Sequence, residues 1–542
     1  KVAPVNLMKR VTLTLLLSGF GLPAIAANGE MDTGTMTNGN YVVGPTFNYP
    51  FNTNSYSGNN RIANSNASVW PTTAANTVDN DGLIESQQSQ LLGEWALRQI
   101  NEEAPRITDA WLQQTLEQIV WQINAVARAD APMALVLIDD RQINAFAVPA
   151  GVIGINVGLL DKSKNLDEVA SVISHEIAHV SQRHYQHRND EKTKHLLLQL
   201  GGMLAGVAAA SAGAGDAGTA VMMGAQTMSA NSAAAFSRDQ EREADRVGMQ
   251  IMAQAGYDVN AMPNFFATLN QQNPVKTNAF IPSFIMSHPL TAERLSEARE
   301  RARQYPNAAL SNNRAYRQQL FDRIQWRAKY FAHLTTKAEL QQAAKTSDGA
   351  KLALAMQLID ERQLSEASRV LQPFASRVAQ FSDPLAVIVS ARLDEAQGNS
   401  QAAIDKLTRL ANVMPERRDV KLYLSDSYLN NKPTADNAAT VLRLLQPVSK
   451  QFPKDIGVWQ RLQQASQVLA KTQTGNDKTL QQINVLRYRA YGQFWQNNLT
   501  EAVTSLNQAK ILAKQLSQNT AIMANLTQQL NQVQQANQFK PD

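Results

Sequence analysis

The sequence predicts a mainly α-helical protein with a small β-sheet confined to its N-terminal half. Apolar residues recur at three- and four-residue spacings over most of the chain. Three short runs of strand-forming residues lie between positions 133 and 157, and alanine pairs recur at a fixed spacing beyond residue 350. With 542 residues, the chain is long enough for two or three domains. We therefore expect an α+β domain followed by an α-helical solenoid.

The composition limits the chemistry that the chain can perform. It contains no cysteine, which excludes disulfides, thiol nucleophiles and thiolate metal sites. The net charge of +5 is small for this length and no lysine- or arginine-rich cluster occurs, so no nucleic-acid partner is expected.

The first residues have the pattern of a secretory signal peptide. Lys9 and Arg10 precede an apolar run over residues 11–22, which ends in a small-x-small cleavage pattern at Ala24 to Ala26. An apolar run this short is expected to be a removed signal rather than a membrane anchor. We predict a signal peptide at 1–26 and export without lipidation.

Residues 27–82 are predicted to be disordered. The segment is rich in Asn, Gly, Thr, Ser and Tyr and shows no periodic apolar face. Such a composition cannot bury enough apolar surface to offset the chain entropy.

The elements of the α+β domain can be placed in order. Two amphipathic helices separated by Pro105 are expected first, followed by strands at 133–138, 143–148 and 151–157. A longer helix then begins after Asn165, a good N-cap, and nothing in the sequence breaks it until beyond His184. We assign residues 83–304 to this domain and 305–349 to linking helices.

Residues 350–542 are predicted to form a tetratricopeptide-like repeat domain. Small residues recur there twelve positions apart, in the pairs Ala355 and Ala367, Ala391 and Ala403, Ser427 and Ala439, and Ala490 and Ala502. Small residues are needed where paired helices cross closely, and such an array presents a concave protein-binding surface. Generic helical hairpins that pack through alanines are the alternative.

The clearest chemical signal is the pentapeptide from His175 to His179, which has the pattern H-E-x-x-H. Histidines four residues apart lie on one face of a helix, so both imidazoles can bind one zinc ion. Glu176 is displaced around the helix and can take a proton from the attacking water as a catalytic base. We predict one zinc ion per chain. The alternative is an amphipathic helix with two histidines in a polar cluster.

A third ligand is expected on a helix that begins after Ser237. Glu241 and Asp245 are four residues apart on this helix and share a face. Glu241 can bind the zinc, and Asp245 can support catalysis by accepting a hydrogen bond from the outer nitrogen of a ligating imidazole. Arg242 and Glu243 are expected to be surface charges.

The other histidines near the pentapeptide are not expected to bind the metal. His184 lies more than one turn beyond His179, which leaves it a structural or supporting role at most. His187 and His195 are expected on the surface.

Four segments together resemble a family of zinc metallopeptidases that includes the heat-shock membrane protease HtpX and the CAAX prenyl proteases. They are NAFA at 144–147, SHEIAHVSQRH, SRDQEREADRVG and SHPLTAERL, in this order. The resemblance implies a zincin-like α+β metallopeptidase domain. It also implies that His288 is a switchable fourth metal ligand, which a substrate displaces.

The resemblance implies further roles around the metal. Asn144 and Arg294 become candidates for contacts with the substrate or with the metal ligands. The strand at 151–157 is expected to lie at an edge of the sheet and to bind a substrate backbone as an added strand.

An exported member of this family with C-terminal repeats implies a periplasmic endopeptidase for quality control of outer-membrane β-barrel proteins. It would degrade stalled or misfolded barrel proteins, support assembly as a chaperone does, and dock on the barrel-assembly machinery through residues 350–542. Two alternatives stay open: a non-proteolytic assembly factor with a silent zinc site, and an integral-membrane zinc protease.

Residues 196–230 bear on the second alternative, because they are apolar enough to suggest a transmembrane hairpin. Leucine is sparse after Leu204, Asp216 interrupts the run, and the many glycines weaken helices. We prefer two short helices that cover the active site, with a peripheral membrane contact left open.

Overall fold

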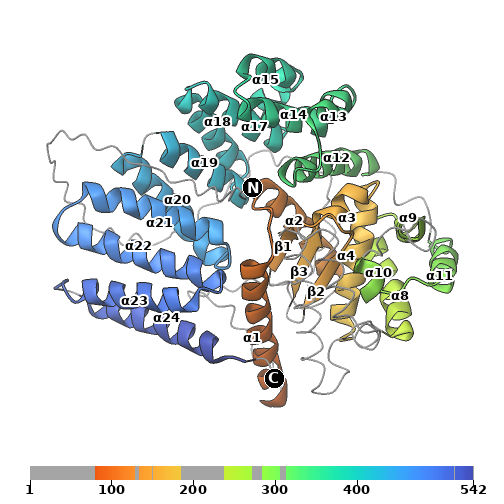
Figure 1. Ribbon diagram of the computed structural model, residues 1–542, viewed down its shortest axis with the longest axis horizontal. Helices are drawn as coiled ribbons and strands as arrows, with labels where there is room; N and C mark the ends of the chain where they lie inside the picture. The colour runs from red at the N-terminus through yellow and green to blue at the C-terminus, as the bar shows by residue number, and fades with distance from the viewer. Residues whose placement is uncertain are drawn as a thin grey trace, which may run out of the picture. The chain divides into compact units, whose positions relative to one another are not determined.

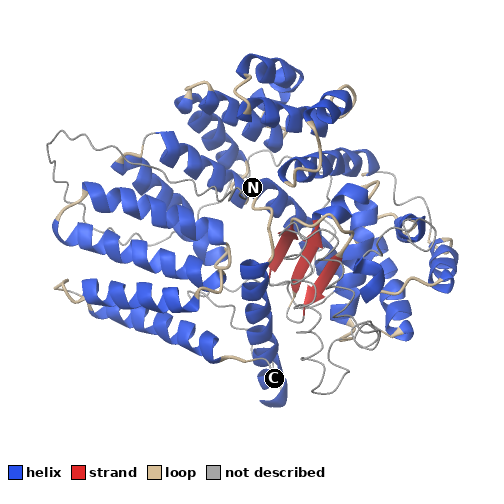
Figure 2. Ribbon diagram, viewed as in Figure 1, coloured by secondary structure: helices blue, strands red, loops and turns tan. Residues whose placement is uncertain are grey.

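A computed structural model describes residues 80–127, 134–148, 151–184, 237–271, 283–305, 313–431, 433–517 and 519–540. Within these residues helices dominate, and the strands form one three-stranded sheet (Figure 1, Figure 2). The mainly α-helical fold class, with a small sheet in the N-terminal half, is confirmed. The predicted signal peptide at 1–26, residues 27–79 of the segment predicted to be disordered and residues 196–230 lie outside the described residues. The last three residues of that segment, 80–82, are helical.

The N-terminal half contains the sheet and the helices around it. In chain order these are α1 (Asn80–Glu103), α2 (Ala110–Ala127), β1 (Ala134–Ile138), β2 (Ala145–Val148), β3 (Val152–Asn156), α3 (Val157–Lys162), α4 (Leu166–Ser181), α8 (Arg238–Gln254), α9 (Ala261–Gln271), α10 (Ser283–Ser287) and α11 (Ala292–Ala302).

Both faces of the sheet are buried. Alternate side chains of each strand enter two apolar layers, with Leu135 and Ile153 facing the layer that contains α2 and α4. Val136 and Val152 face the layer that contains α1. Because both faces are buried, the sequence of each strand is a continuous apolar run rather than an alternation of apolar and polar residues.

The strand order β1-β3-β2 corrects one prediction. β3 pairs with β1 in parallel and with β2 in antiparallel orientation, so it is the middle strand. The prediction that the strand at 151–157 lies at an edge is therefore wrong. Gly154 is needed in this central position, because a Cβ atom there would come 2.2 Å from the ring of Phe146 on β2.

Helix α4 begins as predicted and ends earlier than predicted. The side chain of Asn165 accepts a hydrogen bond from the backbone N–H of Glu168, which caps the first turn. The prediction that the helix continues beyond His184 is wrong, because it ends at Ser181. Arg183 adopts a left-handed conformation with φ of 54°, which turns the chain back on the helix.

From residue 313 onward the described chain is helical. The helices are α12 (Arg314–Phe331), α13 (Lys337–Ala343), α14 (Asp348–Asp360), α15 (Leu364–Leu371), η3 (Gln372–Phe374), α16 (Ala375–Ala379), α17 (Pro384–Ala396), α18 (Ser400–Val413), α19 (Arg418–Asn431), α20 (Ala435–Gln451), α21 (Ile456–Thr472), α22 (Gly475–Trp495), α23 (Leu499–Ala513) and α24 (Thr520–Gln538).

The small residues used to predict the repeats lie on neighbouring helices of this region. Ala355 and Ala367 are on α14 and α15, and Ala391 and Ala403 are on α17 and α18; all four are buried. Gly398 takes a positive φ of 84° in the turn between α17 and α18. The helical C-terminal region is confirmed, and its tetratricopeptide character stays a prediction.

None of the described helices is long and apolar enough to cross a membrane.

Candidate metal centre

Four side chains from separate parts of the chain meet in the N-terminal half. His175 and His179 come from α4, Glu241 from the first turn of α8, and His288 from the residue after α10. All four are buried, and one ligand atom from each lies within 4.8 Å of the other three. The structure thus brings together all four residues that were predicted from the sequence to be metal ligands.

Helix packing places Glu241 opposite the two histidines of α4. Helix α8 begins with the predicted capping box, in which Ser237 and Gln240 exchange hydrogen bonds. Gly248, two turns beyond Glu241, lets α8 approach α4 closely. A Cβ atom at Gly248 would lie 3.3 Å from the Cα atom of His175.

The separations between the ligand atoms fit a single zinc ion. Nε2 of His175 lies 3.0 Å from Nε2 of His179 and 3.2 Å from Nδ1 of His288. Oε1 of Glu241 lies 2.9 Å from Nδ1 of His288 and 3.4 Å from Nε2 of His179. Tetrahedral zinc with bonds of about 2.0–2.1 Å requires ligand atoms roughly 3.3 Å apart. Three imidazoles and one carboxylate are also the donor types that zinc prefers.

Charge in the cluster favours a cation. Burial lowers the pKa of His175, but Asp245 and Glu241 outweigh this effect and raise it to about 9. Burial raises the pKa of Glu241, but His288, His175 and His179 hold it well below its usual range. A metal ion bound here would take the place of the proton on His175 and would neutralise the carboxylates of Glu241 and Asp245.

Two further predicted residues support the cluster from outside. Oδ1 of Asp245 lies 3.0 Å from Nδ1 of His175, on the side of the ring away from the metal position. Arg294 donates a hydrogen bond of 2.8 Å to each oxygen of Asp245, and its Nη1 lies 2.7 Å from Oε2 of Glu241. Arg294 is only 3% exposed, so it is a buried partner of both carboxylates.

The buried carboxylate of Glu176 lies next to the cluster. It is 1% exposed and lies beside the backbone N–H of Ala147. Its Oε1 is 3.3 Å from Nε2 of His288. Burial raises the pKa of Glu176, an effect that His288 and His175 only partly oppose. A buried carboxylate with a raised pKa is suited to accept and release a proton near neutral pH.

His288 occupies the fourth position of the cluster. Its ring stacks on Phe284 with centroids 4.7 Å apart, and its backbone N–H donates to the carbonyl of Phe284. Arg294 also donates a hydrogen bond to the carbonyl of Pro289, so the same arginine holds the segment that carries His288.

Asn144 is buried beside the sheet, directly before β2. Its backbone carbonyl accepts a hydrogen bond from Asn156, and its side-chain oxygen has no partner within the described ranges. No described contact joins its side chain to the four clustered residues.

The structure adds a contact between two other residues near the site. Glu243, expected as a surface charge, has its Oε2 3.2 Å from Nε2 of His184. His184 in turn lies 2.9 Å from His179, Nδ1 to Nδ1. Spacing could not reveal this contact, because it depends on the turn after α4. His187 and His195 lie outside the described residues.

Two histidines and a glutamate around one metal position, with a second buried glutamate beside them, define the class of zinc metallopeptidases. The sequence places the chain within this class. Residues 106–302 match peptidase family M48, so the chain carries an M48 metallopeptidase domain that contains the whole cluster.

Relatives extend the similarity beyond this domain. The chain is 29% identical to the beta-barrel assembly-enhancing protease of Yersinia pestis over 393 residues, 71% of this chain and 78% of that protein. It is 27% identical to the protease of the same name from Escherichia coli K12 over 462 residues, 84% of this chain and 90% of that protein. A putative beta-barrel assembly-enhancing protease of Vibrio cholerae is 33% identical over 230 residues, 42% of this chain and 47% of that protein.

Proposed function

We propose that this chain is a periplasmic zinc endopeptidase that degrades stalled or misfolded outer-membrane β-barrel proteins and so supports barrel assembly. The observation that carries the peptidase activity is the buried cluster of His175, His179 and Glu241 with the buried carboxylate of Glu176 beside it. The names of the relatives from Yersinia and Escherichia support the connection to barrel assembly. The sequence pattern of residues 1–26 supports export.

Each residue of the cluster has one task in this proposal. His175, His179 and Glu241 would hold a zinc ion, which when bound would supply the positive charge that acidifies water and polarises a peptide carbonyl. Glu176 takes the proton of the attacking water on a carboxylate oxygen and passes it to the leaving amine. Asp245 accepts a hydrogen bond from Nδ1 of His175 and so keeps the tautomer with Nε2 free to bind. Arg294 balances the charge of Asp245 and Glu241.

Among the described residues, no strand pairs with the outer edge of β2, and this edge is where the substrate backbone is proposed to bind. In the antiparallel pair of β2 and β3, Asn144 is hydrogen-bonded to Asn156, so alternate residues of β2 face β3. Ala145 and Ala147 therefore direct their backbone groups away from β3. The backbone N–H of Ala147 interacts with the carboxylate of Glu176 and lowers the pKa of Glu176. An unfolded chain can add a strand there with little demand on its side chains.

His288 is proposed to act as an inhibitory fourth ligand. It completes a set of four protein donors, whereas a catalytic zinc needs one open position. A substrate carbonyl would have to displace His288 before cleavage. The same closed set is the observation that favours the alternative function, an assembly factor whose zinc site stays silent.

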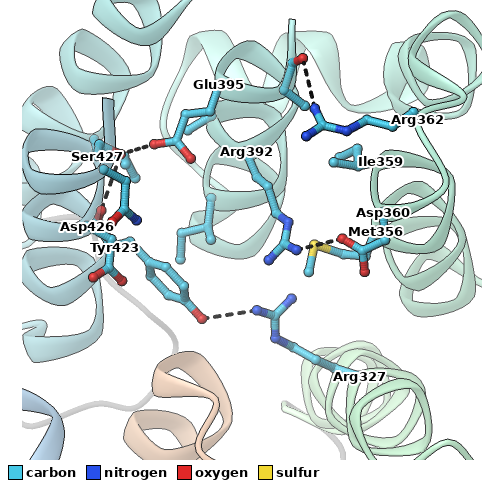
Figure 3. Close-up of a pocket in the computed structure, with 15 residues that line it drawn as sticks. Arg327, Met356, Ile359, Asp360, Arg362, Arg392, Glu395, Tyr423, Asp426 and Ser427 are labelled. Atoms are coloured by element: carbon cyan, nitrogen blue, oxygen red, sulfur yellow. Dashed lines mark hydrogen bonds and ion pairs between the residues drawn. The ribbon is translucent and has the colours of Figure 1, made fainter. Parts of the chain in front are cut away.

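The C-terminal helices offer a place for a protein partner. A cavity of about 540 Å³ opens between α12, α14, α17, α18 and α19. Figure 3 shows its charged lining, in which Arg392 points to Asp360, Glu395 to Ser427, and Arg327 to Tyr423. The buried apolar side chains of Met356, Ile359 and Ile388 line the same cavity. We propose that residues 350–542 dock the enzyme on the barrel-assembly machinery through this lining.

The proposed substrate class can be tested with one barrel protein in two states. The zinc-loaded chain should cleave the unfolded barrel protein and leave the same protein untouched once it is folded in detergent micelles. Equal cleavage of both states, or of neither, would contradict the proposal. The silent-site alternative predicts that Glu176→Gln supports barrel assembly in cells as well as the parent, whereas deletion of residues 350–542 does not.

A further inference from the structure

The turn after α4 brings His184 back onto the metal cluster. The left-handed conformation of Arg183 reverses the chain, and the backbone N–H of His184 donates to the carbonyl of His179 at 3.0 Å. On the other side, Nε2 of Gln240 on α8 donates to the carbonyl of His184 at 3.3 Å. His184 is consequently held by both helices that carry the metal ligands, and it is 2% exposed.

The side chain of His184 connects His179 to a carboxylate. Its Nδ1 lies 2.9 Å from Nδ1 of His179, and its Nε2 lies 3.2 Å from Oε2 of Glu243. Glu243 is on α8 between Glu241 and Asp245, and its side chain is 45% exposed. The three side chains form an uninterrupted line of polar contacts from the metal position to the surface.

We propose that His184 and Glu243 form a relay that fixes the tautomer and orientation of His179. The inference rests on the proposed function, in which His179 binds zinc. Nε2 of His179 faces the cluster and must offer a lone pair, so its proton sits on Nδ1. That proton is donated to Nδ1 of His184, whose own proton is then on Nε2. Nε2 of His184 donates to the carboxylate of Glu243, so every ring nitrogen has one role.

The two ligands of α4 are therefore supported in different ways. His175 meets the buried carboxylate of Asp245 directly, and Arg294 holds that carboxylate with two hydrogen bonds. His179 reaches its carboxylate only through a second imidazole, and that carboxylate is half-exposed. A neutral imidazole nitrogen is a weaker hydrogen-bond acceptor than a carboxylate oxygen, so it raises the basicity of its partner histidine less. His184 is accordingly a positioning residue, which acts on the metal through His179.

The relay predicts a loss of zinc affinity that depends on the chemistry of residue 184. His184→Leu keeps an apolar group of similar size but removes the acceptor, and it should weaken zinc binding about 10–100-fold. His184→Asn should recover most of the affinity, because its Oδ1 can take the place of Nδ1 as acceptor. Glu243→Ala should weaken zinc binding less than His184→Leu does. The matched control is Asp239→Asn, which removes an exposed carboxylate from the same helix.

The measurement is the zinc dissociation constant of the full-length chain, by competition with a chromophoric chelator. The urea midpoint of each metal-free variant shows whether its fold is intact, and if His184→Leu is unfolded the comparison rests on His184→Asn and Glu243→Ala. The relay is overturned if Glu243→Ala and, where it folds, His184→Leu bind zinc like the parent and the control, or if Asn weakens binding as much as Leu. If the parent itself binds no zinc, the proposed function fails rather than the relay alone.

Discussion

At the scale of single residues, Glu241 contacts both His288 and the guanidinium group of Arg294. One of its oxygens lies 2.9 Å from Nδ1 of His288, and the other lies 2.7 Å from Nη1 of Arg294. Arg294 therefore still neutralises this carboxylate when His288 moves away. The charge balance of the site does not depend on His288, which is what a displaceable ligand requires.

His288→Ala should raise the basal rate of proteolysis. The substitution opens the fourth position without removing His175, His179 or Glu241. A fluorogenic assay on an unstructured peptide measures the rate, with His333→Asn as a control that changes an exposed histidine in a left-handed turn. An unchanged or lower rate in His288→Ala would speak against an inhibitory role.

Spacing alone predicted some members of the site and missed others. His175, His179, Glu241 and Asp245 lie one helical turn apart in two pairs, so their shared faces could be read from the sequence. The contact of His184 with Glu243 could not, because it depends on the left-handed turn at Arg183.

At the scale of helices, the site depends on how closely α8 approaches α4. Ala244 and Gly248 lie on the same face of α8 as Glu241, and the glycine allows contact with the backbone of His175. Closer contact of two helices normally needs such small residues at the crossing point. A larger residue at position 248 would move Glu241 relative to the histidines of α4.

Gly248→Ala should therefore lack the stability gain that alanine usually brings inside a helix. An added Cβ would sit 3.3 Å from the backbone of His175, whereas at Gly492 in α22 it would meet no atom within 4 Å. Gly492→Ala should raise the free energy of unfolding by up to about 1 kcal/mol. Urea titration of both variants checks this. An equal gain at both positions would show that α8 is free to move away from α4.

Helix beginnings were easier to predict than helix ends and strand neighbours. Asn165 and Ser237 predicted where α4 and α8 begin, because an N-cap interacts only with residues of the next turn. The central place of β3 depends on pairing with two strands, one of them on each side, and no local pattern encodes that order.

At the scale of the whole described chain, a buried ion network joins the peptidase domain to the C-terminal helices. Asp109 caps α2 and receives two hydrogen bonds from Arg327 of α12, each 2.7 Å long. The hydroxyl of Tyr423 on α19 donates to the same carboxylate at 2.7 Å. Burial raises the pKa of Asp109, but Arg327 and Tyr423 outweigh it and hold this pKa below its usual range.

Tyr423→Phe should destabilise the chain and move acid unfolding to higher pH. The lowered pKa means that Asp109 stabilises the fold above its unfolded-state pKa and loses this effect as pH falls through the folded-state value. Loss of the tyrosine hydrogen bond raises that folded-state value. We expect a loss of about 1.5–3 kcal/mol at pH 7. Urea titrations between pH 3 and 7 measure it, with Tyr305→Phe as control. A loss that is the same for both variants would contradict this account.

The sequence predicted that the chain combines a metal-binding domain with helical hairpins, because both have periodic patterns. It gave no sign that Asp109 and Tyr423 meet, since 314 residues separate them. Contacts of this kind follow from how the helices stack and cannot be read from any local pattern.

The central claim is that Glu176 is the catalytic base of a zinc peptidase. The most direct test compares the cleavage rate of an unfolded protein by the parent and by Glu176→Gln at equal zinc content. Because the substitution keeps the side-chain shape and leaves all four clustered ligand residues in place, zinc should stay bound. The rate should fall by about 10²–10⁴-fold. Cleavage at the parental rate by a zinc-loaded Glu176→Gln chain would contradict the account.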